Sequence, residues 1–306
     1  MKIRFAQLFR TIVLACFAAF FFKLHYTGDI AKFINPKYDI MSKIAAVVFI
    51  FLFFIQLTRV WHFHQHTHAC EDDCGHHHDS GSFMKRSIGH CIIIFPLLTG
   101  FLIAPTTLDA SLAAKKSNIL PRTNQTANQS NKEEASKNLD MEDNGVPALN
   151  NGQTQHERVM TNNNYFSKEE YDKAMEELHQ SDEIQMNNEM YAAYYGEIET
   201  NIEKYIGKKI KTTGFVYREK GLQSNQLVLA RFYMIHCVAD TSVLGFLSEF
   251  EEAGQVEEDT WIEIEGKLDV TTYNGAPIPV IKAEKWKVME EPSDPYIYPP
   301  LIQVIK

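Results

Sequence analysis

Apolar residues fall into three long runs in the first third of the chain, at about 8–26, 41–61 and 88–105. A helix of about twenty residues, rising 1.5 Å per residue, crosses the roughly 30 Å hydrocarbon core of a bilayer. The pattern therefore predicts a membrane region over 1–105 with three transmembrane helices. Pro96 and Gly100 interrupt the third run, which predicts a helix that packs against protein rather than facing lipid all round.

The first run could also be read as a signal sequence, because Cys16 follows a Val-Leu-Ala stretch that resembles a lipoprotein cleavage site. The apolar run continues past Cys16, however, and no small-residue cleavage pattern follows it. Two more apolar runs also come after it. We therefore interpret 8–26 as an uncleaved helix.

Basic residues beside the runs predict the orientation of the helices. Six flank the N-terminus and the connection between the second and third runs, and three lie between the first and second: Lys2, Arg4, Arg10, Arg59, Lys85 and Arg86 against Lys32, Lys37 and Lys43. Because basic residues are retained in the cytoplasm, we expect the N-terminus and the loop 62–79 inside the cell and residues 106–306 outside. Lys115 and Lys116, just beyond the third run, favour the opposite orientation.

Residues 106–186 have the composition of a flexible polar linker. They are rich in Asn, Gln, Ser, Thr and Lys, and large apolar residues are few, so this stretch cannot bury enough surface to order itself. Near its end, Ser167 and Glu170 form a capping-box pattern ahead of apolar residues at helical spacing. That pattern predicts a short helix over 167–180.

Residues 187–306 carry the pattern of a mainly-β domain preceded by a helix, which we expect from Tyr191 to Tyr205. Asn274-Gly275 predicts a hairpin between the last two strands, and a short acidic stretch separates the third strand from the fourth. Five strands with this interruption favour a small closed barrel of the OB-fold type over a sandwich. The predicted strands are Lys209–Arg218, Gln226–Ile235, Val243–Phe250, Trp261–Thr271 and Pro277–Val288.

The loop 62–79 concentrates histidine and cysteine between the second and third apolar runs. It holds seven of the 12 histidines of the chain, two cysteines and four acidic residues. Imidazole and thiolate suit zinc or copper, whereas calcium and magnesium need mostly oxygen ligands. We therefore predict a flexible, multi-ligand loop that binds zinc or another transition metal, and no organic cofactor. The candidate ligands are His62, His64, His66, His68, Cys70, Cys74, His76, His77 and His78.

The spacing within this loop is not that of a zinc finger, because no second pair of ligands follows Cys70 and Cys74 at the finger distance. The alternative is a polar loop whose histidines bind nothing. In that case Cys70 and Cys74 would be free or joined by a disulfide.

A second, weaker metal candidate lies at the end of the second predicted strand, where His236, Cys237 and Asp240 occur close together. The favoured interpretation is structural: Cys237 is a small buried residue, Asp240 caps a turn and His236 faces solvent. A Cys–His pair also suggests nucleophilic catalysis, but no residue to orient the histidine and no oxyanion loop can be identified. We therefore expect no enzymatic activity.

The formal net charge of −9 is spread unevenly along the chain. Residues 1–105 hold 10 Lys/Arg against 6 Asp/Glu, residues 106–186 hold 8 against 14, and residues 187–306 hold 12 against 19, giving +4, −6 and −7. Binding to nucleic-acid phosphates needs a basic face. The acidic C-terminal two thirds therefore argue against a nucleic-acid partner.

Short motifs spread along the chain form a specific combination. They are Thr27-Gly28-Asp29, Ile34-Asn35-Pro36, the loop 62–79, Gly214-Phe215-Val216-Tyr217, Ala230-Arg231-Phe232, Cys237, Ala239-Asp240, Trp261, Gly266 and Asp294-Pro295-Tyr296. Together they resemble the DUF1980 family of bacterial membrane proteins. The resemblance implies a subunit of a two-component permease, a separate polytopic membrane permease as its partner, and a link to metal homeostasis. The family pattern has two adjacent cysteines where this chain has His236-Cys237, which argues against a redox role for a thiol pair.

Polar groups at membrane depth, which a path for a polar solute requires, are few in the three runs: Gln56, Thr99 and His90. We therefore expect a multi-pass protein of the cell membrane that serves a permease as an accessory subunit. Its loop 62–79 would handle zinc or a similar ion, and its tethered barrel would bind a solute or a partner. The alternative is a membrane-anchored binding module in envelope assembly or stress, with no role in transport or metal handling.

Overall fold

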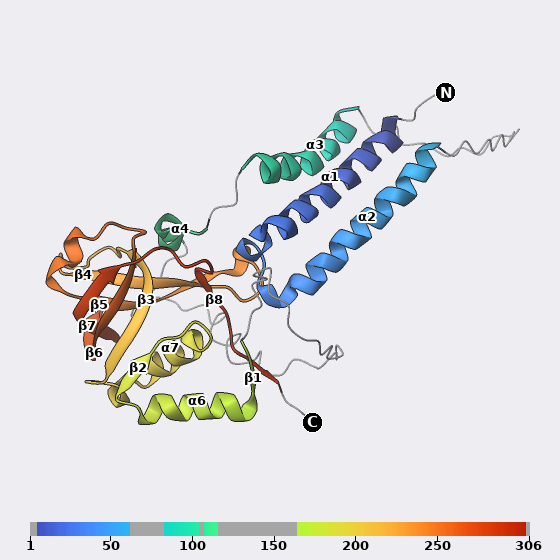
Figure 1. Cartoon of the computed structure of the whole chain (residues 1–306). Helices are drawn as coiled ribbons and strands as arrows, with labels where there is room; N and C mark the ends of the chain where they lie inside the picture. The colour runs from blue at the N-terminus through green and yellow to red at the C-terminus, as the bar shows by residue number, and fades with distance from the viewer. Residues whose placement is uncertain (1–4, 62–82, 104–106, 116–163, 304–306) are drawn as a thin grey trace, which may run out of the picture. The chain divides into compact units, whose positions relative to one another are not determined.

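The structure of the protein is a computed structural model that describes residues 5–61, 83–103, 107–115 and 164–303 (Figure 1). The chain divides into two compact units. The first contains Met1–Thr107, Met160–Asn162 and Met234–Thr241, and the second contains Leu108–Val159, Asn163–Tyr233 and Ser242–Lys306. The predicted metal loop lies outside the described residues.

The first unit is built on three helices: α1 (Phe5–Thr27), α2 (Asp39–Trp61) and α3 (Phe83–Leu102). Gly28, with φ of 78°, follows α1 in the left-handed conformation that glycine adopts readily. Two short 3₁₀ turns, η1 (Asp29–Lys32) and η2 (Pro36–Tyr38), then lead into α2.

Two stretches of the first unit are long and apolar enough to cross a membrane, Gln7–Thr27 and Pro36–Arg59. They correspond to the spans that the apolar pattern predicts over 8–26 and 41–61. In α3 the apolar stretch that the structure describes runs from Ile92 to Leu102. A third span over 88–105 therefore stays a prediction at this point.

Helices α1 and α2 form an antiparallel hairpin. Phe17 stacks on Phe49 with ring centroids 5.3 Å apart. Early in α1, the Gln7 side-chain carbonyl accepts a hydrogen bond from the Gln56 amide at 3.0 Å, and late in α1, His25 lies 3.1 Å from the Ser42 hydroxyl. Since the start of one helix meets the end of the other, the two run in opposite directions.

Helix α3 packs beside α1, as Pro96 and Gly100 led us to expect. Phe101 meets Phe20 edge-on at 5.5 Å between centroids. A Cβ atom on Gly100 would lie 2.9 Å from the Phe20 ring, so glycine permits this close approach. These contacts join the C-terminal end of α3 to the C-terminal part of α1, and Figure 1 shows the two helices running side by side in the same direction.

The second unit contains a seven-stranded mixed sheet with the order β2-β3-β6-β7-β5-β4-β8. The five longest strands lie within two residues of the five predicted from the sequence. The strands are β2 (Glu183–Gln185), β3 (Lys209–Tyr217), β4 (Gln226–Tyr233), β5 (Ser242–Glu249), β6 (Trp261–Tyr273), β7 (Ala276–Val288) and β8 (Tyr296–Ile297).

Additional pairings bend this sheet into a partial ring. Strand β3 pairs antiparallel with β4 as well as with β6, and β5 pairs in parallel with β7. Asn274 and Gly275, with φ of 48° and 82°, form the predicted tight turn between β6 and β7. The strand pairing thus shows a mixed sheet that closes in part, where the sequence predicted an OB-like barrel.

Short helices accompany the sheet. Helix α6 (Lys168–Gln180) begins with the Ser167 and Glu170 capping box, in the place where the sequence predicts a helix. Helix α7 (Tyr191–Thr200) ends earlier than predicted, and the 3₁₀ turn η3 (Ile202–Lys204) follows it. The remaining elements are η5 (Glu251–Gln255) and a separate parallel pair, β1 (Tyr165–Ser167) with β9 (Leu301–Gln303).

Helix α7 supplies part of the core of the second unit. Tyr191 and Ile198 are fully buried in one cluster with residues of the ring such as Leu229. Tyr195 meets the ring of Phe246 edge-on, with centroids 5.0 Å apart. The helix therefore covers apolar side chains that the sheet would otherwise leave open.

The beginning of the predicted flexible linker is ordered. Helix α4 (Ala110–Lys115) buries Ala110 and Ala113. The Ala110 backbone N–H donates a hydrogen bond to the carboxylate of Asp259, and the Leu108 N–H lies 3.4 Å from the Tyr296 hydroxyl. Residues 108–115 thus belong to the β-domain rather than to a linker that starts at 106, because their small alanines fit against it.

We predict that Gly214→Ala destabilises the second unit by about 1–3 kcal/mol, the usual cost of overpacking a filled interior. A Cβ atom at Gly214 would lie 2.6 Å from the Ala230 carbonyl oxygen, and backbone cannot move aside as a flexible side chain can. The measurement is urea unfolding of the full-length protein in detergent, followed by tryptophan fluorescence.

The matched control is Gly196→Ala in α7, where an added Cβ atom meets nothing within 4 Å. This variant should gain about 0.5–1 kcal/mol because alanine is the better helix residue. Equal stability of the two variants would show that β3 and β4 are not as close as described.

Candidate functional site

The connection between α1 and α2 pairs with Met234–Thr241, a segment of the same compact unit. Ile34 and Cys237 form an isolated antiparallel bridge. The Asn35 N–H donates to the His236 carbonyl at 2.9 Å, and the Val238 N–H donates to the Phe33 carbonyl at 2.8 Å. Residues 33–38 and 234–241 together are called the junction below.

The side chain of Asn35 holds the centre of the junction. Asn35 is 1% exposed, and its amide donates to the Met234 carbonyl at 3.2 Å and to the Ile235 carbonyl at 2.9 Å. Its side-chain oxygen accepts the Lys37 N–H at 3.0 Å, which caps η2. Both hydrogens of the amide are used, so neither aspartate nor alanine can replace this residue without loss.

Asp240 organises the turn on the other side of the junction. Its carboxylate accepts the backbone N–H groups of His236 at 2.9 Å and Cys237 at 3.0 Å. The Nδ1 atom of His236 lies 2.7 Å from the same carboxylate, and the His236 ring stacks on Tyr38 with centroids 5.7 Å apart. Asp240 therefore caps this turn, which begins the 3₁₀ turn η4 (Val238–Asp240).

The metal predictions gain no support from this geometry. In the described ranges, no three His, Cys, Asp or Glu side chains are grouped so that they could hold one ion. The ring of His236 lies against the carboxylate of Asp240, but Cys237 meets that carboxylate through its backbone N–H, and the oxygens of Asp240 already accept hydrogen bonds from the turn. A metal at these three residues stays a prediction, and so does zinc in the loop 62–79, which lies outside the described residues.

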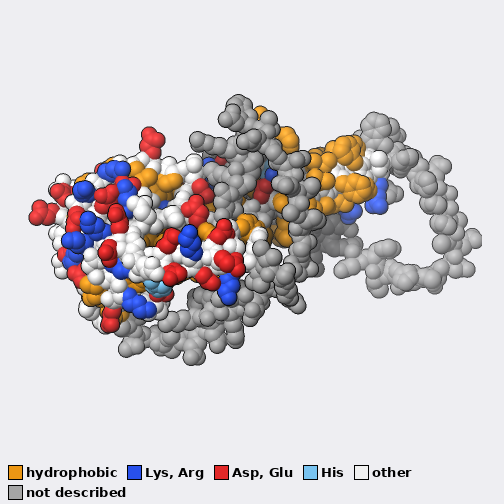
Figure 2. Space-filling model, turned by 60° about the horizontal axis from the view of Figure 1, so that its bottom comes forward, with side chains coloured by type: hydrophobic (Ala, Val, Ile, Leu, Met, Phe, Trp, Pro, Cys, Tyr) orange, Lys and Arg blue, Asp and Glu red, His pale blue; other side chains and the backbone are white. Residues whose placement is uncertain are grey.

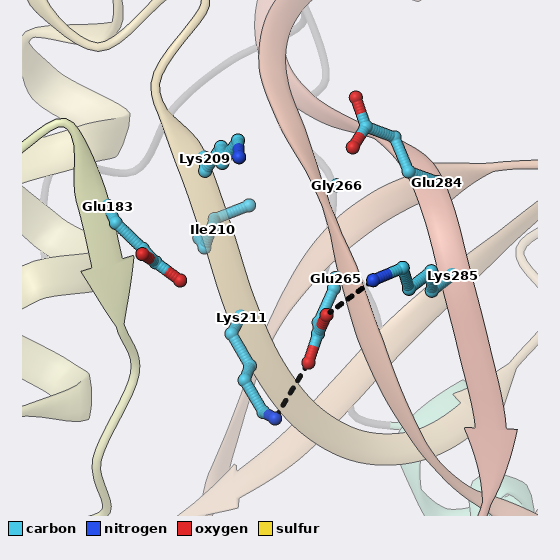
Figure 3. Close-up of a pocket in the computed structure, with 8 residues that line it drawn as sticks. All are labelled: Glu183, Lys209, Ile210, Lys211, Glu265, Gly266, Glu284 and Lys285. Carbon is cyan, nitrogen blue, oxygen red and sulfur yellow. Dashed lines mark hydrogen bonds and ion pairs between the residues drawn. The ribbon is translucent and has the colours of Figure 1, made fainter.

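A groove of about 210 Å³ lies along β2, β3, β6 and β7 (Figure 3). Lys211 contacts Glu265 at 2.7 Å and Glu263 at 3.2 Å, and Lys285 lies 4.0 Å from Glu265. The hydrogen bond from Lys211 lowers the pKa of Glu265, and the same bond raises the pKa of Lys211. Because these charges already pair with one another, the groove offers a charged ligand little net attraction.

Comparison with known proteins places both parts of the chain in one family. Residues 9–119 match the DUF1980 N-terminal domain, and residues 160–299 match the DUF1980 C-terminal domain. The chain is also 30% identical over 316 residues to the UPF0703 protein YcgQ of Bacillus subtilis, covering 95% of this chain and 99% of that protein. The chain belongs to the DUF1980 family.

A second relative comes from Streptococcus mutans and is described as "Putative two-component membrane permease complex subunit". It is 24% identical over 298 residues, covering 94% of this chain and 98% of that protein. The resemblance that the sequence motifs suggest is thus confirmed over nearly the full length.

Two of the DUF1980 motifs meet in the junction. Ile34-Asn35-Pro36 follows the first helix and Cys237 lies some 200 positions later, yet the two are bridged. Both motifs can be identified in the sequence, but the sequence does not predict that they are in contact. Nor did it predict that the Asn35 side chain donates hydrogen bonds across this contact. The stacking of Tyr38 on His236 was missed as well, because no local pattern encodes a contact over this separation.

We predict that Ile34→Cys forms a disulfide with the native Cys237. Ile34 and Cys237 form a non-hydrogen-bonded antiparallel pair, because the backbone hydrogen bonds join the residues on either side of them. The Cα atoms of such a pair lie about 4.5 Å apart, within the roughly 4.4–6.8 Å range of disulfides. The variant is made in the full chain with Cys16, Cys70, Cys74 and Cys91 changed to Ser, and is oxidised in membranes. Mass spectrometry of tryptic digests should then detect the crosslinked peptide.

Two controls accompany this experiment. Ile34→Cys with Cys237→Ser should give no crosslink, and Lys37→Cys with native Cys237 should give much less, since Lys37 is exposed and unbridged. If Lys37→Cys crosslinks as efficiently as Ile34→Cys, the described register of the junction is wrong.

Proposed function

We propose that this chain is the accessory subunit of a two-component membrane permease, and that a separate polytopic membrane protein supplies the transport path. The role is not enzymatic. The description of the Streptococcus mutans relative, which aligns over 94% of this chain, supports the proposal.

The observation that carries this proposal is that polar side chains of the helices hydrogen-bond to other groups of the same chain. Thr11 donates to the Gln7 carbonyl of its own helix, and Thr99 donates to the Phe95 carbonyl of its own. Gln56 bonds Gln7 across the α1–α2 hairpin. A path for a polar solute needs polar groups that face a cavity at membrane depth. The side chains of Thr11, Thr99 and Gln56 instead have hydrogen-bond partners within the chain.

The outward face of α2 is apolar. Ile44, Val47, Phe51 and Phe54 are between 57% and 65% exposed, and Figure 2 shows hydrophobic side chains gathered along the helices. Exposed apolar area of this extent is what lipid, or another helical membrane protein, covers. The bilayer and a permease subunit are therefore the partners that we propose for this face.

We propose that the chain crosses the membrane three times, with the N-terminus and the loop 62–79 in the cytoplasm and residues 106–306 outside the cell. Helix α2 carries the chain away from residues 33–38, yet residues 234–238 hydrogen-bond to those same residues. A further crossing between Trp61 and Met234 would return the chain to that side of the membrane, and α3, parallel to α1, would supply it.

The proposed topology predicts which positions a membrane-impermeant maleimide reaches in intact cells. In a chain without native cysteines, Lys37→Cys and Glu252→Cys should react before permeabilisation, and Ser80→Cys only after it. Lys37 and Glu252 are both exposed, so lack of reaction reports sidedness rather than burial. Reaction of Glu252→Cys only after permeabilisation, while Lys37→Cys still reacts before it, would refute the third crossing.

For the β-domain we propose an OB-like barrel that binds a solute or a partner. The five main strands pair in the order β3 with β4, β4 with β5, β5 with β7, β7 with β6, and β6 with β3. A partly open five-stranded barrel is the form of OB-folds, which bind ligands on one face.

The permease role is tested by isolating the tagged full-length protein from its own cells after crosslinking in the membrane. A polytopic membrane protein should co-purify in near-equal amount, and this chain should become less abundant when that protein is deleted. If the chain purifies alone and its abundance does not depend on any other membrane protein, the alternative of an independent membrane-anchored binding module is correct.

We propose that the loop 62–79 binds zinc or a similar ion through its histidines and cysteines. The full-length protein should retain near-stoichiometric zinc after dialysis, measured by elemental analysis. Changing His62, His64, His66, His68, His76, His77 and His78 to Ala should abolish this zinc, whereas changing His25, His179 and His236 to Ala should not. Zinc lost instead on Cys237→Ala would move the site to the junction, and no zinc in any form would refute metal binding.

A further inference from the structure

Arg231 of β4 is fully buried between two aromatic rings. The centre of its guanidinium group lies 5.2 Å from the ring centroid of Trp261 and 5.6 Å from that of Tyr191, and the residue has 0% exposure. Its Nη1 atom donates to the Thr213 hydroxyl at 3.3 Å. The rings hold the guanidinium in place by cation–π contact, but they satisfy none of its N–H groups.

The other two nitrogen atoms of this guanidinium, Nε and Nη2, are buried and have no hydrogen-bond partner among the described residues. These two N–H groups lie on the same edge of the planar group and point in the same direction. An edge of this kind forms two parallel hydrogen bonds with the two oxygens of a carboxylate or phosphate. The unused part of Arg231 is therefore a complete fork for an oxyanion.

Tyr191, whose ring contacts the guanidinium, links it to Thr212. The Tyr191 hydroxyl interacts with the Thr212 hydroxyl. In the described part of the chain, these two hydroxyls and the two Arg231 nitrogens are the buried side-chain polar atoms without a well-formed hydrogen bond. Buried polar groups in folded proteins are nearly always paired, so the open edge of Arg231 indicates a site for a ligand.

Asp294 is an acidic residue near enough for its charge to affect the pKa of Arg231, but it does not hydrogen-bond to Nε and Nη2. Its carboxylate accepts hydrogen bonds from the Tyr298 hydroxyl at 3.1 Å and the Tyr296 N–H at 3.3 Å. No ion pair joins Asp294 to Arg231 in the described residues, and burial raises the pKa of Asp294, which weakens it as a counter-ion. Burial of an unpaired cation is strongly unfavourable, so an anion from outside the chain is favoured.

We propose that Arg231, together with the hydroxyl groups of Tyr191 and Thr212, binds a small oxyanion, either a carboxylate-bearing solute or phosphate. The fork supplies two charged donors, and the interacting hydroxyl pair of Tyr191 and Thr212 supplies one more. This site deepens the solute-binding role proposed above and rests on it for its biological meaning, while binding itself is measurable without a permease.

The test is thermal unfolding and calorimetric titration of the full-length protein in detergent. Sodium phosphate and sodium acetate are compared with sodium chloride at equal ionic strength. A ligand that binds only the folded state raises the melting temperature, and we expect a rise of about 3 °C or more with at least one of the two anions. The anion that gives the larger rise distinguishes phosphate from a carboxylate.

Variants locate the effect. Arg231→Lys keeps the charge but loses the fork and should weaken binding at least about tenfold, and Tyr191→Phe should weaken it as well. Arg218→Lys is the matched control, because Arg218 donates to the Ala253 and Val256 carbonyls and has a structural role. It should lower the melting temperature without changing the rise that the anion causes.

The proposal is overturned if neither anion raises the melting temperature beyond chloride while Arg231→Met is more stable than the native protein in all three salts. That result would mean that the unpaired guanidinium has no ligand and only costs stability. Failure of this kind leaves the accessory role intact if a permease still co-purifies. Anion binding by a chain that purifies alone would uphold the site and refute the permease role.

Discussion

The hydrogen bonds of Asn35 are the interaction on which the arrangement of the first unit depends. Its amide donates to two carbonyls that lie 199 and 200 positions further along the chain. Closing a loop of that length costs roughly 5 kcal/mol in chain entropy. Two side-chain and two backbone bonds at about 0.5–1.5 kcal/mol each only match this cost. The junction therefore cannot form alone, and it depends on structure elsewhere in the chain that shortens the effective loop.

Two arginines of the β-domain differ in the hydrogen-bond acceptors that the fold provides for their N–H groups. Arg218 finds two carbonyl acceptors, in Ala253 and Val256, at 2.7 and 2.6 Å. Arg231, more deeply buried, finds the Thr213 hydroxyl and two aromatic faces. Leaving a buried donor without an acceptor costs about 1–3 kcal/mol, and more for a charged group. The fold gives the Nη2 atom of Arg218 two carbonyl acceptors and gives the Nε and Nη2 atoms of Arg231 none, so the open edge of Arg231 points to a function.

The sequence predicted local elements well because each has a local cause. The apolar runs, the capping box of Ser167 and Glu170, and the Asn274-Gly275 turn all act over a few residues, and the structure has a helix or a turn at each. Helix α4 was missed because its alanines carry a weak signal in a polar stretch, and only packing against the β-domain orders them. The early end of α7 has a similar cause, since the chain must turn through η3 to enter β3.

The candidate sites were harder to predict because their partners are distant in sequence. The motif around Asn35 and the one around Cys237 were both visible, but their pairing is a property of the folded chain. Arg231 was also visible within a motif, yet its burial and its unpaired edge depend on Tyr191 and Trp261, each tens of positions away. The histidines of the loop 62–79 are the opposite case, since the sequence makes the chemistry plain and the described residues do not include them.

An oxyanion site in an acidic domain is not a contradiction, because the two effects act over different distances. Residues 187–306 hold 12 Lys/Arg against 19 Asp/Glu, a formal −7, and the face that Figure 2 shows has both signs mixed rather than gathered in one patch. At physiological salt the field of such surface charges decays over about 8 Å. Hydrogen bonds from a buried guanidinium act at about 3 Å in a medium of low dielectric constant, where water and salt do not screen them. The surface charge therefore slows the arrival of an anion, and the contacts at Arg231 decide how tightly it is held.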